Sequence, residues 1–116
     1  MTELLSEAWV GLLVEASADR QGRGSAVVEL AIGKTKQARF AITDGRVTGA
    51  VDTETDVGVR VPLTAKQLSA LIEGSESLAQ AFMRGDVKPE GATGHLLPLV
   101  ELFEDVSFRQ RLAALA

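Results

Sequence analysis

The sequence predicts an α+β domain in which helices cover one face of an open antiparallel sheet. Apolar residues recur at helical spacing over residues 5–16, alternate every second residue between residues 26 and 61, and return to helical spacing after residue 64. The length of 116 residues suits one domain, so we expect a single domain spanning residues 1–116.

The composition is typical of a soluble globular domain, with 46% hydrophobic and 24% charged residues. Twelve Lys and Arg against sixteen Asp and Glu give a net charge of −4, whereas a nucleic-acid binder usually has a basic excess. The absence of cysteine excludes disulfides, thiolate nucleophiles and iron–sulfur clusters.

Neither targeting nor membrane insertion is indicated by the first residues. They are acidic where a signal peptide needs positive charge. The longest apolar run, residues 9–14, is far shorter than the ~20 residues that span a bilayer. We therefore expect a cytoplasmic protein without stable membrane insertion.

A first helix is predicted before residue 19, with Thr2 as its N-cap. Its apolar stripe follows helical spacing and comprises Leu5, Trp9, Leu12, Leu13 and Ala16. The polar, glycine-containing loop 19–25 ends it.

Four strands follow, over residues 26–32, 38–42, 47–51 and 57–61. Asp44-Gly45 between the second and third is typical of a two-residue hairpin turn. Because tight turns predominate, we expect an antiparallel meander that Pro62 ends.

Helical spacing then returns. Thr64 is expected to cap a helix that Gly74 closes, and Ser75 or Ser77 to cap a shorter one that Gly85 ends. Residues 87–89 read as a short extended piece at a sheet edge.

Residues 95–103 are apolar nearly all round, and Pro98 fits the first turn of a helix there. Such a helix is either deeply buried or lines an apolar cavity. A last helix over residues 107–116 should turn Leu112 and Leu115 inward.

Motifs for phosphate and metal binding are incomplete. Residues 33–35 resemble the end of a phosphate loop but lack its first glycine and lie between two strands. The alternating carboxylates of residues 52–56 resemble a calcium loop, yet Val57 and Leu63 stand where glycine and glutamate are needed. We expect no metal and no cofactor.

Catalytic motifs are equally sparse. His95 is the only histidine and the one weak catalytic candidate, and no Gly-x-Ser-x-Gly elbow supplies a nucleophile. A structural role suits a lone histidine better, although a carboxylate in an apolar pocket remains an alternative acid–base group. Arg60 and Arg84 flank apolar segments and could rim a ligand site or simply face solvent.

From residue 40 to residue 103 the sequence resembles the sterol carrier protein 2 (SCP-2) family. The residues that carry this resemblance are Phe-Ala-Ile-Thr-Asp-Gly at 40–45, Leu-Ser-Ala-Leu-Ile-Glu-Gly at 68–74, Ala-Phe-Met-Arg-Gly-Asp-Val-Lys-Pro-Glu-Gly at 81–91, and Leu-Phe at 102–103. Two positions depart from the family pattern, Asp86 in place of a common lysine and Ala92 in place of a common acidic residue.

The resemblance implies a five-stranded, mostly antiparallel sheet covered by helices on one face, with an apolar cavity between sheet and helices. Members bind sterols, fatty acids, acyl-CoA or other lipids there. Carried over by position, the ligand-binding residues are Phe40, Ile42, Leu68, Leu71, Phe82, Leu99 and Phe103.

We therefore expect non-catalytic binding or carrying of an apolar small molecule such as a lipid, sterol, fatty acyl chain or polyketide-like compound. The first alternative is a small cyclase or isomerase that uses the same cavity, with His95 or a buried carboxylate as acid–base. The second is an accessory module that acts with a partner enzyme or forms a homodimer.

Overall fold

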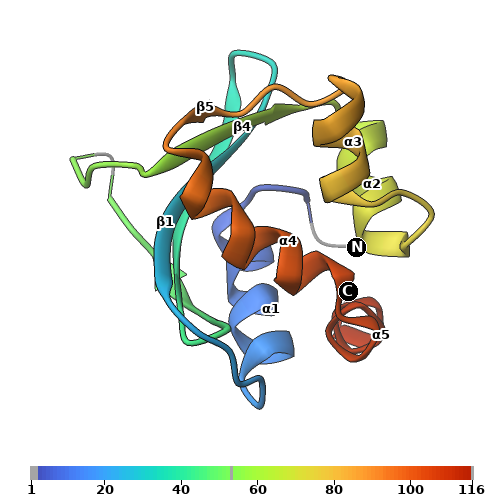
Figure 1. Ribbon diagram of the computed structural model, residues 1–116. Coiled ribbons are helices and arrows are strands. Elements are labelled where there is room, and N and C mark those ends of the chain that lie inside the picture. The colour runs from blue at the N-terminus through green and yellow to red at the C-terminus, as the bar shows by residue number, and fades with distance from the viewer. Residues whose placement is uncertain (1–2, 53, 116) are drawn as a thin grey trace.

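The computed structural model describes residues 3–52 and 54–115, which form five helices, five strands and one 3₁₀ turn (Figure 1). The helices are α1 (Glu7–Ser17), α2 (Ala65–Glu73), α3 (Leu78–Arg84), α4 (Leu96–Glu104) and α5 (Val106–Leu115). The strands are β1 (Ser25–Ile32), β2 (Lys36–Thr43), β3 (Arg46–Ala50), β4 (Val59–Leu63) and β5 (Glu90–Gly91), and the 3₁₀ turn is Thr93–His95.

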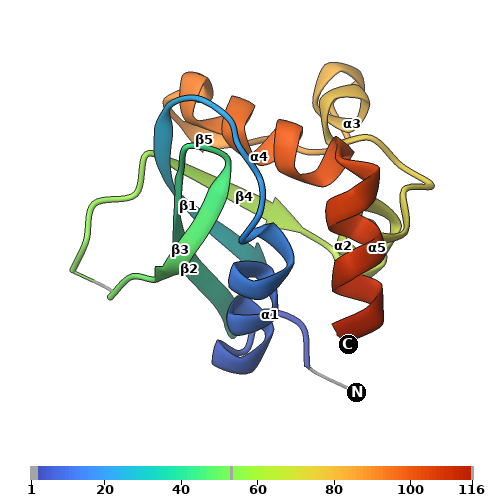
Figure 2. The same ribbon diagram turned by 90° about the horizontal axis from the view of Figure 1, so that it is seen from below.

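One five-stranded sheet has the order β3-β2-β1-β4-β5, and only the β1–β4 pair is parallel. The helices lie on one side of it (Figures 1 and 2), with α1 against β3 and α4 against β1. The other helices pack outside these two, α5 against α1 and α4, α3 against α4, and α2 against α5. This confirms an α+β fold with a mostly antiparallel sheet covered on one face.

The predicted meander is wrong, because β4 lies beside β1 and not beside β3. The chain therefore returns across the sheet between the end of β3 at Ala50 and the start of β4 at Val59. β1 therefore lies at the centre, where both of its faces are shielded, and it buries Glu29 and Ala31 as well as Val28 and Leu30.

Pro62 does not end the strands, contrary to the sequence prediction. It lies within β4, opposite Ala31 of β1. The short β5 pairs only with Val59 and Arg60, so Pro62 occupies a part of β4 that has an open edge. A proline is tolerated there because its missing N–H removes no ladder hydrogen bond.

Most local start and stop signals act as predicted. A capping box of Thr64 and Gln67 begins α2, and Gly74 ends it with φ 83°. Ser77, one of the two predicted alternatives, caps α3, and Gly85 ends it with φ 80°.

The N-terminal helix begins later than predicted. Ser6 caps α1 by accepting a hydrogen bond from the Trp9 backbone N–H. Thr2, the predicted cap, lies outside the described residues. Leu5, just before the cap, has φ 65°, a conformation that a leucine adopts only under constraint.

Asp44 and Gly45 form the predicted hairpin turn, with φ values of 53° and 85°. Gly45 also packs against the loop before β1. A Cβ at Gly45 would lie 2.8 Å from the Gly22 backbone nitrogen, so only glycine fits this turn.

Ser17 ties α1 to the sheet. Its buried hydroxyl donates to the Leu13 carbonyl at 2.7 Å and accepts from the Val47 backbone N–H at 2.9 Å. This hydrogen bond gives the buried start of β3 a partner that the sheet does not supply.

The junction between α4 and α5 is held to the loop after α1 by Asp105. Its carboxylate accepts from the Phe108 backbone N–H at 3.2 Å and forms an ion pair with Arg20. Burial acts to raise the pKa of Asp105, but the Phe108 N–H and the Arg20 charge together lower it below its ordinary value.

The last helix buries Phe108 and Leu112, whereas Leu115 is exposed, so its predicted inward position is wrong. Helical spacing places all three on one face. Leu115 is the final residue of α5 and lies beyond the part of this face that packs against the core.

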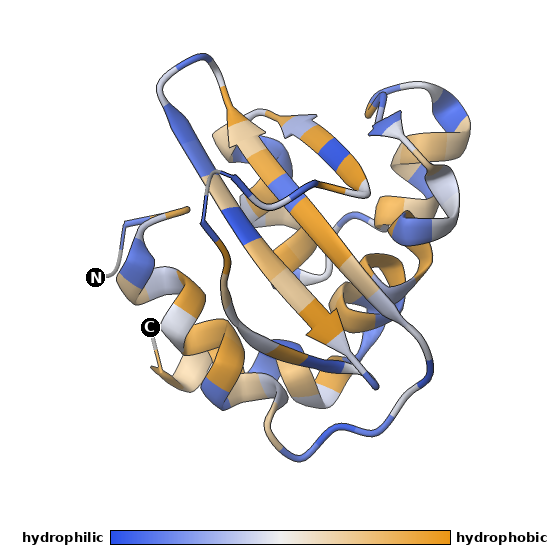
Figure 3. Cartoon of the chain, turned by 90° about the vertical axis from the view of Figure 1, so that its left-hand side faces the viewer, coloured by the Kyte–Doolittle hydropathy of each residue, from blue (hydrophilic) through white to orange (hydrophobic). Residues whose placement is uncertain are grey.

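The outer face of the sheet carries a row of alternating charges across four strands. Glu29 on β1 is opposite Arg39 on β2 and Arg60 on β4, and Arg60 is opposite Glu90 on β5. The Glu29 carboxylate accepts from Arg39 Nε at 2.6 Å and from Arg60 Nε at 2.8 Å. Figure 3 shows this face, where hydrophilic positions interrupt otherwise apolar strands.

Candidate ligand-binding site

An apolar groove of about 280 Å³ lies between α3 and α4. We call it the α3–α4 groove. It is lined by Ala79, Phe82, Met83, Thr93, Leu96, Leu97 and Val100. Among these lining residues the Thr93 hydroxyl is the only polar side-chain group, so the groove suits an apolar molecule.

Helix α3 supplies one wall because it is short and sharply ended. It buries Leu78 and Ala81 and turns Phe82 and Met83 outward. Gly74, which ends α2, and Gly85, which ends α3, both have positive φ, so the chain turns sharply on each side of this seven-residue helix.

Helix α4 supplies the other wall, and its use of two faces explains why residues 95–103 are apolar nearly all round. Its inner face fills the core with Leu99, Leu102 and Phe103. Leu97 points outward, and Leu96 and Val100 belong both to the core and to the groove. The floor of the groove is therefore the outer surface of the core.

Three large apolar side chains of the groove are exposed to solvent. The exposed fraction is 40% for Phe82, 83% for Met83 and 59% for Leu97. Single exposed apolar residues are ordinary, but three gathered around one groove indicate a surface that a ligand or partner covers.

The structure places the seven predicted ligand-binding residues in two environments. Six of them lie in the core, each at most 2% exposed: Phe40, Ile42, Leu68, Leu71, Leu99 and Phe103. Leu71 also borders a small pocket of about 140 Å³ beside α3. Phe82 alone among the seven lines the α3–α4 groove.

Met83, Leu97 and the groove floor formed by Leu96 and Val100 were not predicted from the sequence. The signal in the sequence was the excess of apolar residues in these two helices. Once the inward stripe of each helix is assigned, Phe82, Met83 and Leu97 are left over on the outer faces.

The two arginines that the sequence offered for a ligand rim both bind carboxylates outside the groove. Arg84 pairs with Glu76 at 2.5 Å and Asp86 at 2.9 Å, and hydrogen bonds to these carboxylates raise the pKa of its guanidinium. Arg60 belongs to the charged row on the outer face of the sheet. Neither lines the α3–α4 groove.

His95 lies near the groove without lining it. Its ring rests on Gly58, where any Cβ would overlap the imidazole. The Nδ1 atom is buried and has no hydrogen-bond partner within residues 3–52 and 54–115. The buried carboxylate of Glu29 faces the opposite side of the sheet and binds two guanidinium groups.

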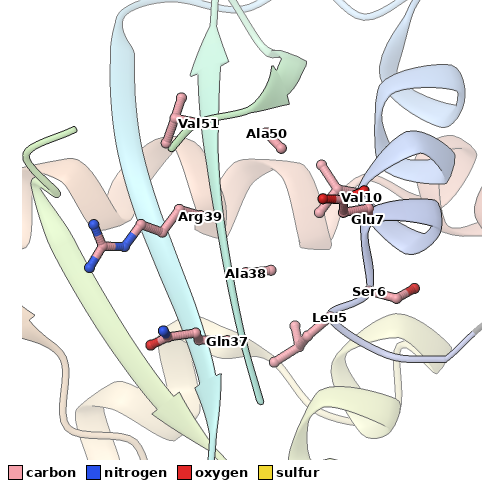
Figure 4. A pocket seen from close by; sticks show the side chains of 9 residues that line it. All are labelled: Leu5, Ser6, Glu7, Val10, Gln37, Ala38, Arg39, Ala50 and Val51. Carbon is pink, nitrogen blue, oxygen red and sulfur yellow. The ribbon is translucent and has the colours of Figure 1, made fainter. Parts of the chain in front are cut away.

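A second pocket, of about 220 Å³, lies between the start of α1 and strands β2 and β3 (Figure 4). Leu5, Val10 and Ala38 meet on its inner side, whereas the side chains of Gln37 and Arg39 point away toward the outer face of the sheet. Leu5 and Val10 flank the Ser6 cap in the positions of a hydrophobic staple. This pocket is thus explained by the packing that begins α1.

Two further properties of the described chain bear on function. Nowhere in the described ranges do three or more His, Cys, Asp or Glu side chains gather as a metal site would require. Of the helices in the same ranges, none has the length and apolar character needed to cross a bilayer.

The chain is similar to known proteins both in sequence family and in structure. The family model of the SCP-2 sterol transfer family matches residues 12–104. No curated protein sequence matches the chain.

Solved structures share the fold at low identity. The TT1886 protein of Thermus thermophilus, described as possibly a sterol carrier protein, is 20% identical, with 100% of this chain and 92% of that chain covered and a TM-score of 0.66. A crystal structure of sterol carrier protein 2 is 18% identical, with 95% and 97% covered and a TM-score of 0.64.

The same fold also occurs within a larger enzyme. The sec-alkylsulfatase Pisa1 from Pseudomonas sp. matches at 18% identity and a TM-score of 0.54, with 85% of this chain but only 15% of that chain covered. These structures share the fold, and the match of the family model over residues 12–104 shows that the chain belongs to the SCP-2 sterol transfer family.

Proposed function

We propose that this protein binds and carries an apolar small molecule, with a lipid, sterol or fatty acyl chain as the ligand class, and that the α3–α4 groove is where the molecule enters. One observation carries the proposal: Phe82, Met83 and Leu97 are exposed around a groove whose floor is the core. Membership of a sterol transfer family supports the same ligand class.

The driving force would be burial of apolar surface, worth roughly 25 cal/mol per Å². Ligand sites for drug-sized molecules usually enclose ~300–1,000 Å³. The groove, at about 280 Å³, is just below this range and suits part of a lipid rather than all of it.

We infer that the rest of the ligand passes inward when α3 moves aside. Helix α3 has only seven residues and lies between Gly74 and Gly85, whose positive φ values suit hinge positions. The side chains that would then line the interior are the six core residues Phe40, Ile42, Leu68, Leu71, Leu99 and Phe103.

A carrying role is favoured over catalysis by the lining of the groove. Its seven lining residues include no titratable side chain. The acid–base candidates do not line it, since the His95 ring rests on Gly58 and Glu29 faces the opposite side of the sheet.

The proposal is tested by equilibrium binding of an uncharged fluorescent sterol, dehydroergosterol, to the protein and to the Phe82→Asp variant. A charge at Phe82 would have to be desolvated by the ligand, so we expect affinity to fall by about tenfold or more. Leu115→Asp is the matched control, because Leu115 is 41% exposed against 40% for Phe82 and lies on α5 outside the groove. Unchanged probe affinity in a folded Phe82→Asp variant would exclude the groove.

A further inference from the structure

Another pocket, of about 260 Å³, lies between α2 and α5 and shares no lining residue with the α3–α4 groove. We call it the α2–α5 pocket. Its lining combines charged, polar and apolar side chains: Ile72, Glu73, Val106, Arg109, Gln110 and Ala113.

Arg109 differs from the other half-buried arginines. Arg20, Arg39 and Arg60 each bind a carboxylate. Arg109, also half-buried, has neither an ion pair nor a side-chain hydrogen bond to any residue that the structure describes, and its Nε atom is fully buried.

The guanidinium of Arg109 has a close neighbour in the backbone, although no described residue binds it. It lies against Gly74 at the end of α2, where any Cβ would overlap it. A buried donor without an acceptor is unfavourable, and a planar guanidinium matches the two oxygens of a carboxylate or phosphate.

The rest of the pocket provides contact for an apolar chain. Ile72 and Ala113 line it beside Arg109, and Val106 is 55% exposed at the same place. Glu73 also lines the pocket but forms no ion pair with Arg109 within the described residues, so its charge opposes an incoming anion.

We propose that the α2–α5 pocket binds the carboxylate or phosphate head group of a single-chain amphiphile, with Arg109 as the anion-binding residue and Val106 in contact with the chain. This site is separate from the α3–α4 groove, and the proposal does not depend on the function proposed for that groove.

The test is a titration of ¹⁵N-labelled protein with octanoate, octyl phosphate, octanol and inorganic phosphate, followed through the backbone amides of α2 and α5. We expect saturable shifts with octanoate or octyl phosphate, and affinities for octanol and inorganic phosphate lower by tenfold or more. The two anionic probes distinguish a fatty-acid-like from a phospholipid-like source. Octanol binding as tightly as octanoate, or inorganic phosphate as tightly as octyl phosphate, would overturn the proposal.

Variants test the role of Arg109 directly. Arg109→Gln should weaken binding of the anionic probes by about tenfold. Arg111→Gln is the control, since Arg111 is on the same helix but exposed and paired with Asp19 at 3.5 Å. Equal affinity of the folded Arg109→Gln variant would overturn the assignment.

Glu73→Gln keeps the test decisive if Arg109→Gln fails to fold. Removing this exposed charge should tighten binding of the anionic probes several-fold, and unchanged or weaker binding would contradict the proposal. Phe82→Asp should leave the shifts in α2 and α5 unchanged, which separates this site from the groove.

Discussion

Replacing Glu29 by glutamine tests whether the charged row on the outer face holds the central strands together. Glu29 is only 3% exposed, and its two carboxylate oxygens each bind one arginine, at 2.6 Å and 2.8 Å. Glutamine has the same shape but only one acceptor oxygen. Its amide N–H₂ must face the second guanidinium, donor against donor.

The expected loss follows from these contacts. A hydrogen bond between charged groups contributes about 1.5–3 kcal/mol, and removing one partner of a buried pair costs ~3–5 kcal/mol. The Arg39 and Arg60 side chains are 24% and 37% exposed, and they keep contacts with the Thr55 carbonyl and with Glu90, so the penalty for losing one contact with Glu29 is reduced. We expect Glu29→Gln to lower the free energy of unfolding by about 2–4 kcal/mol.

Glu90→Gln is the matched control, because Glu90 binds the same Arg60 at 3.2 Å but its side chain is 65% exposed. An exposed pair contributes about 0–1 kcal/mol. Urea unfolding followed by the fluorescence of Trp9, the only tryptophan and a buried one, measures both variants. If Glu29→Gln loses no more stability than Glu90→Gln, the row does not stabilise the sheet.

Three further predictions concern local structure. Gly45→Ala should lower the free energy of unfolding by over 2 kcal/mol, roughly twice the ~1 kcal/mol expected for Gly33→Ala. Both glycines have positive φ, but of the two only Gly45 has backbone atoms within 4 Å of an added Cβ. Equal losses of stability in thermal unfolding would contradict the clash. Ser17→Ala should lower the free energy of unfolding by about 1–3 kcal/mol and speed hydrogen exchange at the Val47 amide, because this amide loses its buried acceptor. An unchanged exchange rate would refute the role of Ser17. The folded-state pKa of Asp105 is lowered, so its contribution to stability is present above the ordinary pKa and is lost as pH falls through the folded value. The stability difference between wild type and Asp105→Asn should therefore be largest near neutral pH and shrink in acid unfolding curves, whereas a constant difference from about pH 6 to pH 3 would contradict this linkage.

Features set by neighbouring residues were predictable from the sequence. The Asp44-Gly45 turn and the Thr64 cap need only a few adjacent residues to form, and both occur as predicted. The central position of β1 depends instead on residues 51–58 crossing the sheet. Its apolar residues on both faces, around a single glutamate, were the available signal for a central strand.

The sequence predicted which segments of the candidate site are apolar, but it did not predict where the groove lies. Spacing identifies Phe82 and the helix at 95–103 as apolar without showing which side chains fill the core. Leu99 and Phe103 turn inward, whereas Phe82 and Leu97 stay exposed, because α3 packs across α4 and covers only part of it. That arrangement depends on tertiary packing, so periodicity within either helix could not reveal the groove.

Methyl NMR of Met83 tests the central claim most directly. Met83 lines the α3–α4 groove, is 83% exposed and is one of only two methionines, so Met83→Leu assigns its ¹³C-methyl signal. On titration with palmitate we expect this signal to shift saturably, and the shift to be lost in Phe82→Asp. A Met83 signal that palmitate leaves unmoved would contradict the proposed entry of an apolar ligand through the groove.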